Sequence, residues 1–223
     1  MSDSDDQPQL NSSTIAALEQ FLRDKQEREN LLKHMCEKDQ TLDVLLDEDW
    51  QLSQFWYNNE TIETFVRGAL NSTTEDGQIA LISCPTLYKK LKQECGKRRS
   101  FVYIVVLFEY DSRFKMYGMD FIQYDYKFPL DLPRDMSSQF DLVIADPPFL
   151  SDECLTKTAV TIKFLTKKHI VLCTGAIMTE LAEKLLNVKK CDFIPGHKNN
   201  LANEFYCYSN FEFDKFMKCE NNI

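Results

Sequence analysis

Three features of the sequence predict an α/β fold with an open, mostly parallel sheet. Strand-like apolar runs alternate with helical patterns through residues 58–223. The run Phe101–Phe108 is apolar and β-branched almost without interruption, which is typical of a strand buried on both faces. The last run, Glu204–Phe213, alternates apolar and polar residues instead. Such a strand often joins a parallel sheet in the antiparallel direction, at or near an edge.

The remaining elements follow from hydrophobic periodicity and from turn residues. Strands are expected at 79–83, 121–124, 140–145, 169–173 and 191–194, and a loop at Gly96–Arg99. Helices are expected after a cap at Asn59, from Pro85, after a cap at Ser151 or Asp152, and along a stripe made by Ile177, Leu181 and Leu185. The sheet domain is therefore predicted to occupy residues 58–223.

The region before this domain is divided into a tail and an arm. Residues 1–11 are polar and acidic, so we expect a disordered tail. Residues 12–57 read as a helical arm, with Ile15, Leu18 and Leu22 on one face. The arm could pack on the domain or hold a partner. Its end gathers aromatic residues, which usually enter a core but can also line a ligand pocket: Trp50, Phe55, Trp56 and Tyr57.

The charge of the chain restricts its partners. Its 26 basic and 35 acidic residues give a formal net charge of −9. Proteins that grip duplex DNA or structured RNA usually carry a basic footprint, so we expect a protein partner rather than nucleic acid. The longest apolar run is too short to span a bilayer, and Asp3, Asp5 and Asp6 stand where a signal peptide needs basic residues. We expect a monomeric protein without a membrane segment.

The cysteines and histidines give no sign of a metal centre. The eight cysteines include no Cys-x-x-Cys pair, and the three histidines lack ligand spacing. Several cysteines fall inside expected strands. We therefore expect free thiols in a reducing cytosol or nucleus, of which we choose the cytoplasm, and no metal site.

Acidic residues follow three successive strands of the expected sheet. Glu109, Asp125 and Asp146 each end such a strand, so they should share its carboxyl edge. The first two could accept hydrogen bonds from ribose hydroxyls and an adenine amino group, and the third would face the reacting centre. An acid at one strand end is commonly a turn former or helix cap. Three in order favour a site for a nucleoside cofactor.

The third acid belongs to the stretch Asp146-Pro147-Pro148-Phe149. Two successive prolines fix φ and carry no N–H, so this backbone is stiff and offers only carbonyl acceptors. Beside an aromatic ring, these acceptors suit a substrate amino group, which is a donor. On these four residues alone, a strand followed by a tight turn is an equal alternative.

The order of elements resembles the seven-stranded, Rossmann-like methyltransferases that use S-adenosylmethionine. The stretch Asp146–Phe149 resembles the [Asp/Asn]-Pro-Pro-[Tyr/Phe] motif of their amino-group branch, which acts on adenine, glutamine and lysine nitrogens. Longer stretches narrow the resemblance: Gln123–Tyr126, Pro129–Pro133, Ala145–Leu155, Leu172–Met178 and Asn200–Phe205. Together they are similar to the small eukaryotic lysine methyltransferases of translation elongation factor 1-alpha, once described as adenine-specific DNA methyltransferases.

This resemblance, which covers roughly residues 12–210, implies a cofactor, a substrate and roles for particular residues. The cofactor would be S-adenosylmethionine and the substrate a lysine of translation elongation factor 1-alpha. Asp146 and the Pro147 carbonyl would accept N–H bonds from the amine, and Phe149 would cover it. The expected cofactor-binding residues are Ser83, Glu109 or Asp111 at the ribose, Asp125, and a roof of Phe55, Trp56 and Tyr57.

The chain departs from the family pattern at two places, and two other functions stay open. The family has a glycine-rich turn after the first strand, but Ser83-Cys84-Pro85-Thr86 contains no glycine. The stretch Arg98–Leu107 also exceeds the pattern by a few residues, which leaves Glu109 and Asp111 as alternatives for the ribose. One competing function is an adenine methyltransferase acting on DNA or RNA, which the net charge opposes. The other is a non-catalytic module that has lost cofactor affinity.

Overall fold

The structure is a computed structural model that describes residues 14–16, 19, 20, 23, 48, 49, 52, 54–74, 76–97, 104–199, 201 and 203–219. The chain divides into two compact units, Met1–Asp47 and Glu48–Ile223. In the first unit the described residues are helical and exposed. The acidic tail, Leu18, Leu22 and Trp50 lie outside the described residues. Residues 48–57, which the sequence groups with the arm, belong to the second unit.

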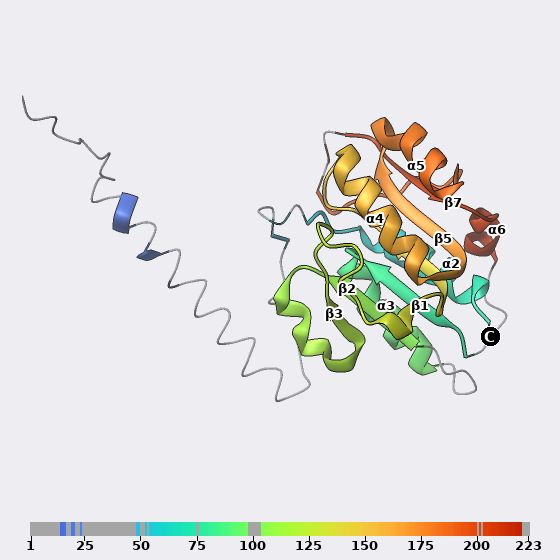
Figure 1. Ribbon diagram of the computed structural model, residues 1–223, viewed down its shortest axis with the longest axis horizontal. Coiled ribbons are helices and arrows are strands. Elements are labelled where there is room, and N and C mark those ends of the chain that lie inside the picture. Colours follow the sequence, from blue (N-terminus) through green and yellow to red (C-terminus); the bar gives the residue numbers. More distant parts are fainter. Residues whose placement is uncertain are drawn as a thin grey trace, which may run out of the picture. The chain divides into compact units, whose positions relative to one another are not determined.

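A seven-stranded sheet, ordered β3-β2-β1-β4-β5-β7-β6, organises the second unit (Figure 1). Its strands are β1 (Gln78–Ile82), β2 (Ile104–Glu109), β3 (Phe121–Gln123), β4 (Phe140–Ala145), β5 (Thr166–Gly175), β6 (Lys189–Lys190) and β7 (Phe205–Ser209). The first five are parallel, and β7 runs antiparallel between β5 and β6. The predicted fold, including the antiparallel C-terminal strand, is confirmed.

Helices cover both faces of the sheet. They are α2 (Asn59–Ser72), α3 (Pro85–Lys97), α4 (Asp152–Leu165), α5 (Thr179–Leu186) and α6 (Phe213–Lys218), with short 3-10 turns η3 (Ser112–Asp120), η4 (Arg134–Met136) and η5 (Ala176–Met178). Helices α4 and α5 pack on one face, while α2, α3 and α6 lie on the other (Figure 1). Within the described part of the chain, no helix is long and apolar enough to cross a membrane.

Burial on both faces explains the apolar strands. In β2 every residue after Ile104 is buried, and β1 and β4 are buried along almost their whole length. Polar side chains at these positions would lose their hydration, so the sequence uses long apolar runs. Residues 101–103, the start of the expected second strand, lie outside the described part.

Several helix boundaries differ from those expected. Asn58, not Asn59, caps α2, because its Oδ1 accepts the Thr61 N–H at 2.9 Å. Helix α3 continues through Gly96, which was expected in a loop. Ile177 is 75% exposed in η5, so it is not part of the α5 stripe, whose buried residues are Ala182 and Leu186.

The expected strand Cys191–Ile194 does not form, and α6 was not predicted. The carboxylate of Asp214 on α6 accepts the backbone N–H groups of Asp192 at 3.0 Å and Phe193 at 3.1 Å. These donors are therefore not used in a sheet ladder, and the strand is limited to Lys189–Lys190. A side chain from a distant helix decides this local structure, so periodicity in the sequence could not show it.

Candidate active site

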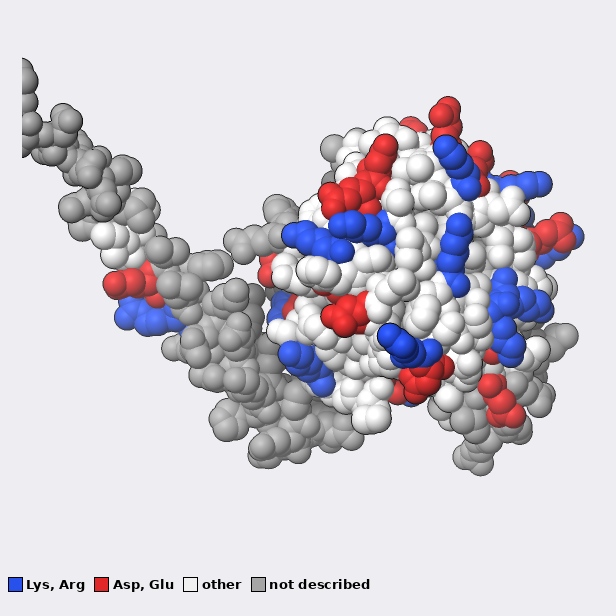
Figure 2. All heavy atoms as spheres, viewed as in Figure 1, with Lys and Arg blue, Asp and Glu red and all other residues white. Residues whose placement is uncertain are grey.

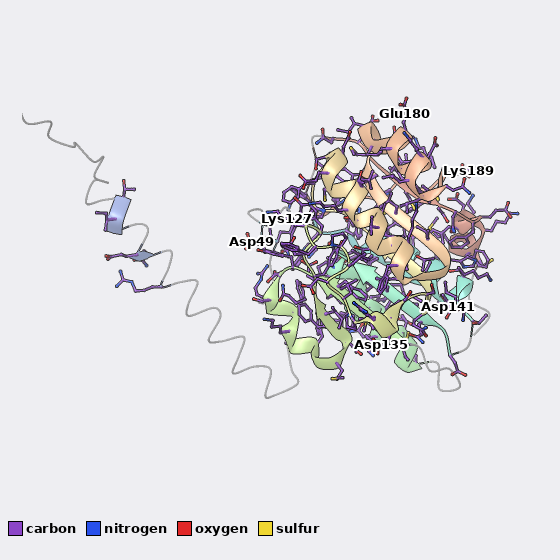
Figure 3. The ribbon with its side chains drawn as sticks, in the orientation of Figure 1. Asp49, Lys127, Asp135, Asp141, Glu180 and Lys189 are labelled. Carbon is purple, nitrogen blue, oxygen red and sulfur yellow. The ribbon has the colours of Figure 1, made fainter. Side chains whose placement is uncertain are left out.

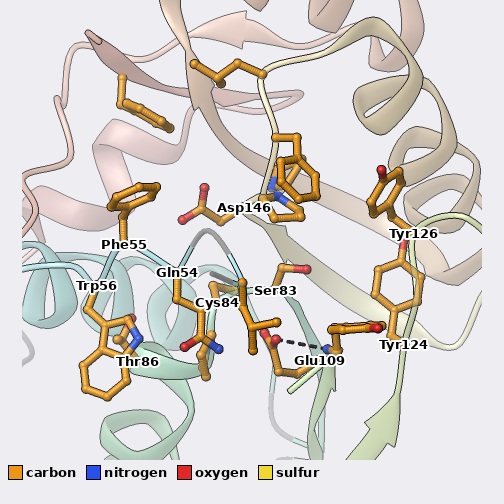
Figure 4. Close-up of a pocket in the computed structure, with 18 of the residues that line it drawn as sticks. Gln54, Phe55, Trp56, Ser83, Cys84, Thr86, Glu109, Tyr124, Tyr126 and Asp146 are labelled. Atoms are coloured by element: carbon orange, nitrogen blue, oxygen red, sulfur yellow. Dashed lines mark hydrogen bonds between the residues drawn. The ribbon is translucent and has the colours of Figure 1, made fainter. Parts of the chain in front are cut away.

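A cavity of about 680 Å³ opens at the carboxyl edge of the sheet. Figure 4 shows Ser83, Glu109 and Asp146, from the ends of three strands, around one hollow, with Phe55 opposite Asp146. The cavity is lined by Leu52, Gln54, Phe55, Trp56, Ser83, Cys84, Pro85, Thr86, Glu109, Tyr110, Tyr124, Asp125, Tyr126, Lys127, Asp146, Pro147, Pro148, Phe149, Leu150, His197, Leu201, Asn203 and Phe205. Most residues predicted for the site therefore meet in one place.

The turn after β1 forms without glycine. Ser83 adopts the left-handed conformation, with φ of 55°, and its N–H donates to the Phe108 carbonyl at 2.9 Å. This conformation costs a residue with a side chain about 1 kcal/mol, which glycine would avoid. The turn leads into α3, and Cys84, Pro85 and Thr86 at the start of this helix line the cavity. The positive end of the helix therefore favours an anionic group there.

Glu109 is the acid of β2 that reaches the cavity. Its side chain is 5% exposed and accepts the N–H groups of Tyr110 at 3.0 Å and Asp111 at 3.1 Å. Burial raises the pKa of Glu109 to about 7, and the charge of Asp111 adds to the rise, while the two backbone hydrogen bonds oppose it. A carboxyl group of this kind can pair with hydroxyl groups of a ligand.

Asp111 is not among the described residues that line the cavity. Its carboxylate accepts hydrogen bonds from Gln54 Nε2 at 3.0 Å and from Arg113 Nε at 2.7 Å, and it also pairs with Arg113 Nη2 at 2.6 Å. The sequence left Glu109 and Asp111 as alternatives for a ribose. In the structure Glu109 lines the cavity. Asp111 instead accepts a hydrogen bond from Gln54, whose side chain lines the cavity.

Asp146 ends β4, and its N–H donates to the Ile82 carbonyl at 2.9 Å. Burial raises the pKa of Asp146 to about 7, and the negative charge of Glu109 adds to the rise, whereas the Tyr57 hydroxyl lowers it. Its side chain points into the hollow that it shares with Phe55 (Figure 4). Pro147 and Phe149 continue this wall, and Phe149 is 42% exposed at the mouth. The predicted amine acceptors thus lie together beside aromatic faces.

Tyr57 lies under the site rather than in its lining. Its side chain is 1% exposed, and its hydroxyl has no hydrogen-bond partner among the described residues. The hydroxyl lies beside Asp146 and Cys173, and burial, followed by the charge of Asp146, raises the pKa of Tyr57. Its ring packs 5.5 Å from Phe65 and 5.2 Å from His197, measured between centroids. The sequence expectation of a Tyr57 roof does not match this position.

Asp125 is also at the cavity, as expected, because it follows β3. Its Oδ1 accepts the Lys127 N–H at 2.9 Å, so the carboxylate forms a local turn as well as lining the hollow. Lys127 stands at this carboxyl edge, whereas Asp141, near the start of β4, lies at the opposite edge (Figure 3). The acids at the carboxyl ends of β2, β3 and β4, which are Glu109, Asp125 and Asp146, therefore lie at one edge, while Asp141 lies at the other.

Several lining residues were missed in the sequence. Gln54 directly precedes the aromatic residues 55–57, which drew attention instead, and His197 belongs to no recognisable motif. Burial lowers the pKa of His197, so its imidazole is neutral near pH 7. Asn203 and Phe205 lie within the resembling stretch Asn200–Phe205, so this stretch held a signal for them.

Known relatives share nearly the whole length of this chain. A family model described as "Probable N6-adenine methyltransferase" matches residues 48–213. "EEF1A lysine methyltransferase 1" of Mus musculus is 49% identical over 98% of both chains. The chain belongs to this methyltransferase family. The same-named protein of Homo sapiens is 47% identical over 93% of this chain and 94% of its own. The "Protein-lysine N-methyltransferase EFM5" of Saccharomyces cerevisiae is 35% identical over 91% and 92%.

Two solved structures share the fold of this chain, although their sequences are only distantly similar to it. A putative class I S-adenosylmethionine-dependent methyltransferase from Listeria monocytogenes has a TM-score of 0.51 at 9% identity, over 82% of this chain and 67% of that one. A branched-chain polyamine synthase from Thermus thermophilus, in complex with N4-aminopropylspermidine and 5'-methylthioadenosine, gives 0.50 at 10% identity, over 82% and 61%. Both support the Rossmann-like arrangement of the methyltransferase sheet.

Proposed function

We propose that this methyltransferase transfers a methyl group from S-adenosylmethionine to the ε-amine of a lysine in translation elongation factor 1-alpha. The half-buried Asp146 carboxylate, beside the Pro147 carbonyl in a cavity that also contains Glu109, is the observation that supports the chemistry. The names of relatives that match nearly the full chain support the choice of substrate.

The residues present fit the proposed cofactor. A cavity of about 680 Å³ is within the usual size for cofactor sites. Glu109 would accept hydrogen bonds from ribose hydroxyls, Asp125 would accept one from the adenine amino group, and the start of α3 would favour the carboxylate of the methionine part. Phe55 and Trp56 supply apolar cover. When bound, the cofactor would provide an electrophilic methyl group on a sulfonium.

The nucleophile must be a neutral amine. A lysine ammonium has no lone pair, and its ordinary pKa is about 10.4, so a proton must leave the nitrogen before attack. The bound cofactor would supply the methyl group and leave as a neutral thioether, so positive charge would pass to the amine nitrogen. Asp146 would accept one N–H and stabilise this charge, and the Pro147 carbonyl would accept another. These two acceptors orient the lone pair toward the methyl group.

Asp146 alone favours the charged lysine, because a carboxylate stabilises a neighbouring cation. Desolvation in the closed cavity and the nearby sulfonium act in the opposite direction. Phe149 would cover the amine and its methylene stem at the mouth of the cavity. Asp146 is thus assigned to orientation and charge stabilisation rather than to proton removal.

A nucleic-acid substrate is less well supported than a protein substrate, although the matching family model is described as a probable N6-adenine methyltransferase. The net charge is −9, and Figure 2 shows acidic and basic side chains interspersed over the visible face of the second unit. A continuous basic surface would be expected of a protein that grips a phosphate backbone. We also propose a monomer that acts in the cytoplasm, which the free thiols at the described cysteines fit.

The test is methyl transfer from radiolabelled S-adenosylmethionine to purified elongation factor, with an oligonucleotide containing adenine assayed in parallel. Label should enter a lysine of the elongation factor and be absent from the oligonucleotide. Asp146→Ala should lower transfer at least about 100-fold, while calorimetry finds cofactor affinity nearly unchanged. Label in the oligonucleotide alone, or full activity of the variant, would reject the proposal.

A further inference from the structure

A second groove, of about 460 Å³, adjoins the catalytic cavity. Four residues line both hollows: His197, Leu201, Asn203 and Phe205. Because the same side chains form a wall of each hollow, a molecule lying in the groove can extend a side chain past this wall toward Asp146. The groove is therefore continuous with the proposed reaction site.

The base of the groove is held in place by two distant segments of the chain. The Asn58 N–H donates to the Gly196 carbonyl at 3.0 Å, and the Lys198 N–H donates to the Trp56 carbonyl at 2.8 Å. Gly196 also donates its N–H to Thr61 Oγ1 at 2.8 Å. A Cβ at Gly196 would lie 2.4 Å from Asn58 Nδ2, so a side chain there would displace the Asn58 amide that caps α2. The groove is consequently formed before a partner binds.

The lining combines apolar and amide side chains. Ile194 is 61% exposed, so it contributes little to the core of this unit. Asn203 is exposed and makes no hydrogen bond to another described residue. An amide side chain carries both a donor and an acceptor, which matches the alternating N–H and C=O groups of an extended polypeptide. A large exposed apolar side chain beside such groups is typical of a protein-binding surface.

The charges in the groove disfavour a phosphate backbone. Its described lysine, Lys190, has its ammonium 3.2 Å from the centre of the Tyr206 ring. The Glu204 carboxylate accepts the Tyr206 hydroxyl at 2.7 Å on the same side. A nucleic acid in the groove would bring phosphates to this carboxylate, whereas a basic polypeptide would not be repelled by it.

We propose that this groove holds the polypeptide segment that flanks the target lysine, so that the lysine side chain turns past His197 and Asn203 into the catalytic cavity. This inference rests on the proposed function, because it needs a protein substrate. The methylene stem would lie along Leu201 and Phe205. Burial keeps the His197 imidazole neutral, so the wall does not repel an incoming ammonium. Specificity for the sequence around the lysine would then depend on the groove, and catalysis on the cavity.

The test compares two variants of exposed apolar residues, Ile194 after β6 and Met119 before β3, which are the first and last strands in the order of the sheet. Ile194→Arg fills the groove and adds a positive charge, whereas Met119→Arg adds the same charge before β3, where Met119 is 95% exposed. With the protein that wild type labels as substrate, Ile194→Arg should raise KM about tenfold or more. Its kcat at saturation and its cofactor affinity by calorimetry should stay at wild-type values. Met119→Arg should match wild type in all three.

An unchanged KM in Ile194→Arg, beside an active wild type, would overturn the groove and leave the proposed function standing. An equal rise in both variants would also overturn it, because the added charge would then explain the effect. A wild-type protein that labels no protein would reject the proposed function itself, and with it the groove. Thermal melting should show all three proteins folded, since both side chains are exposed.

Discussion

Gln54 donates its side-chain amide to the carboxylate of Asp111 across 3.0 Å, joining residues 57 positions apart in the sequence. Gln54 Oε1 in turn accepts Arg113 Nη2 and the Asp49 N–H, each at 3.1 Å. This network ties the segment that carries Phe55 and Trp56 to the end of β2. Asp111 thus shapes the cavity wall from outside the cavity, while Glu109 lines it.

Asp111→Asn and Glu109→Gln should separate these two roles. Asp111→Asn removes the negative charge that faces the Arg113 guanidinium and should destabilise the protein by about 2 kcal/mol, less than for a fully buried pair. Glu109→Gln should instead weaken cofactor binding about tenfold without lowering stability. Denaturant unfolding and calorimetry measure the two effects. Equal losses of cofactor affinity with normal stability in both variants would place Asp111 on the cofactor as well.

The stability of the ligand-free protein should fall as the pH rises through neutrality. The pKa of Glu109 is about 7 in the folded state, against an ordinary value of 4.5. The folded state therefore binds this proton more tightly, and stability present below about pH 4.5 is lost as the pH rises through 7. The loss should approach about 3 kcal/mol. Glu109→Gln should show a flatter profile of unfolding free energy between pH 5 and 8, and parallel profiles would contradict the assignment.

The sheet could be predicted because its strands obey a local rule. Strands buried on both faces are apolar along almost their whole length, so the expected strand Phe140–Ala145 coincides with β4, in which only the partly exposed Asp141 is charged. The strand expected at Cys191–Ile194 fails because Asp214, far along the chain, takes the backbone donors. Local pattern predicts burial well, but it does not report which distant side chain satisfies a backbone group.

The residues of the site also fall into two groups, those that a local rule predicts and those that distant segments bring to the cavity. Glu109, Asp125 and Asp146 could be found because parallel strands bring their carboxyl ends to one edge. Gln54 and His197 could not, since each reaches the cavity through contacts between distant segments, such as the Tyr57–His197 bridge. Tyr57 is expected in the roof with Phe55 and Trp56 but does not line the cavity, because a cluster of aromatics does not show which ring faces inward.

Tyr57→Phe should change the pH dependence of methyl transfer more than the stability. In the proposed mechanism the ionised form of Asp146 accepts the amine N–H, so activity should rise with pH through about 7. The Tyr57 hydroxyl lowers the pKa of Asp146, so its removal should shift this rise toward higher pH. Because phenylalanine keeps the ring contacts with Phe65 and His197, unfolding should be nearly unaffected.

The measurement is kcat/KM against pH for wild type and Tyr57→Phe, with thermal melting as a check on folding. Both enzymes act on the same lysine, so its own titration cancels in the comparison. Coincident pH profiles would show that the hydroxyl does not act on Asp146. A large loss of stability would instead show that the hydroxyl supports the fold, because phenylalanine keeps the ring contacts with Phe65 and His197.

Gly175→Ala should narrow the catalytic cavity through Leu150. A Cβ at Gly175 would lie 2.8 Å from both methyl carbons of Leu150, and Leu150 lines the cavity. The ends of a leucine side chain can move, so the protein should remain folded, but Leu150 would be pushed into space that the ligands need. We expect about a tenfold loss of kcat/KM, measured by methyl transfer at subsaturating substrate. Full activity of Gly175→Ala would show that Leu150 moves away from the cavity rather than into it.

Gly96→Ala is the matched control, because a Cβ there meets nothing within 4 Å. Since Gly96 lies in α3, this control should retain full activity and gain about 0.5–1 kcal/mol of stability.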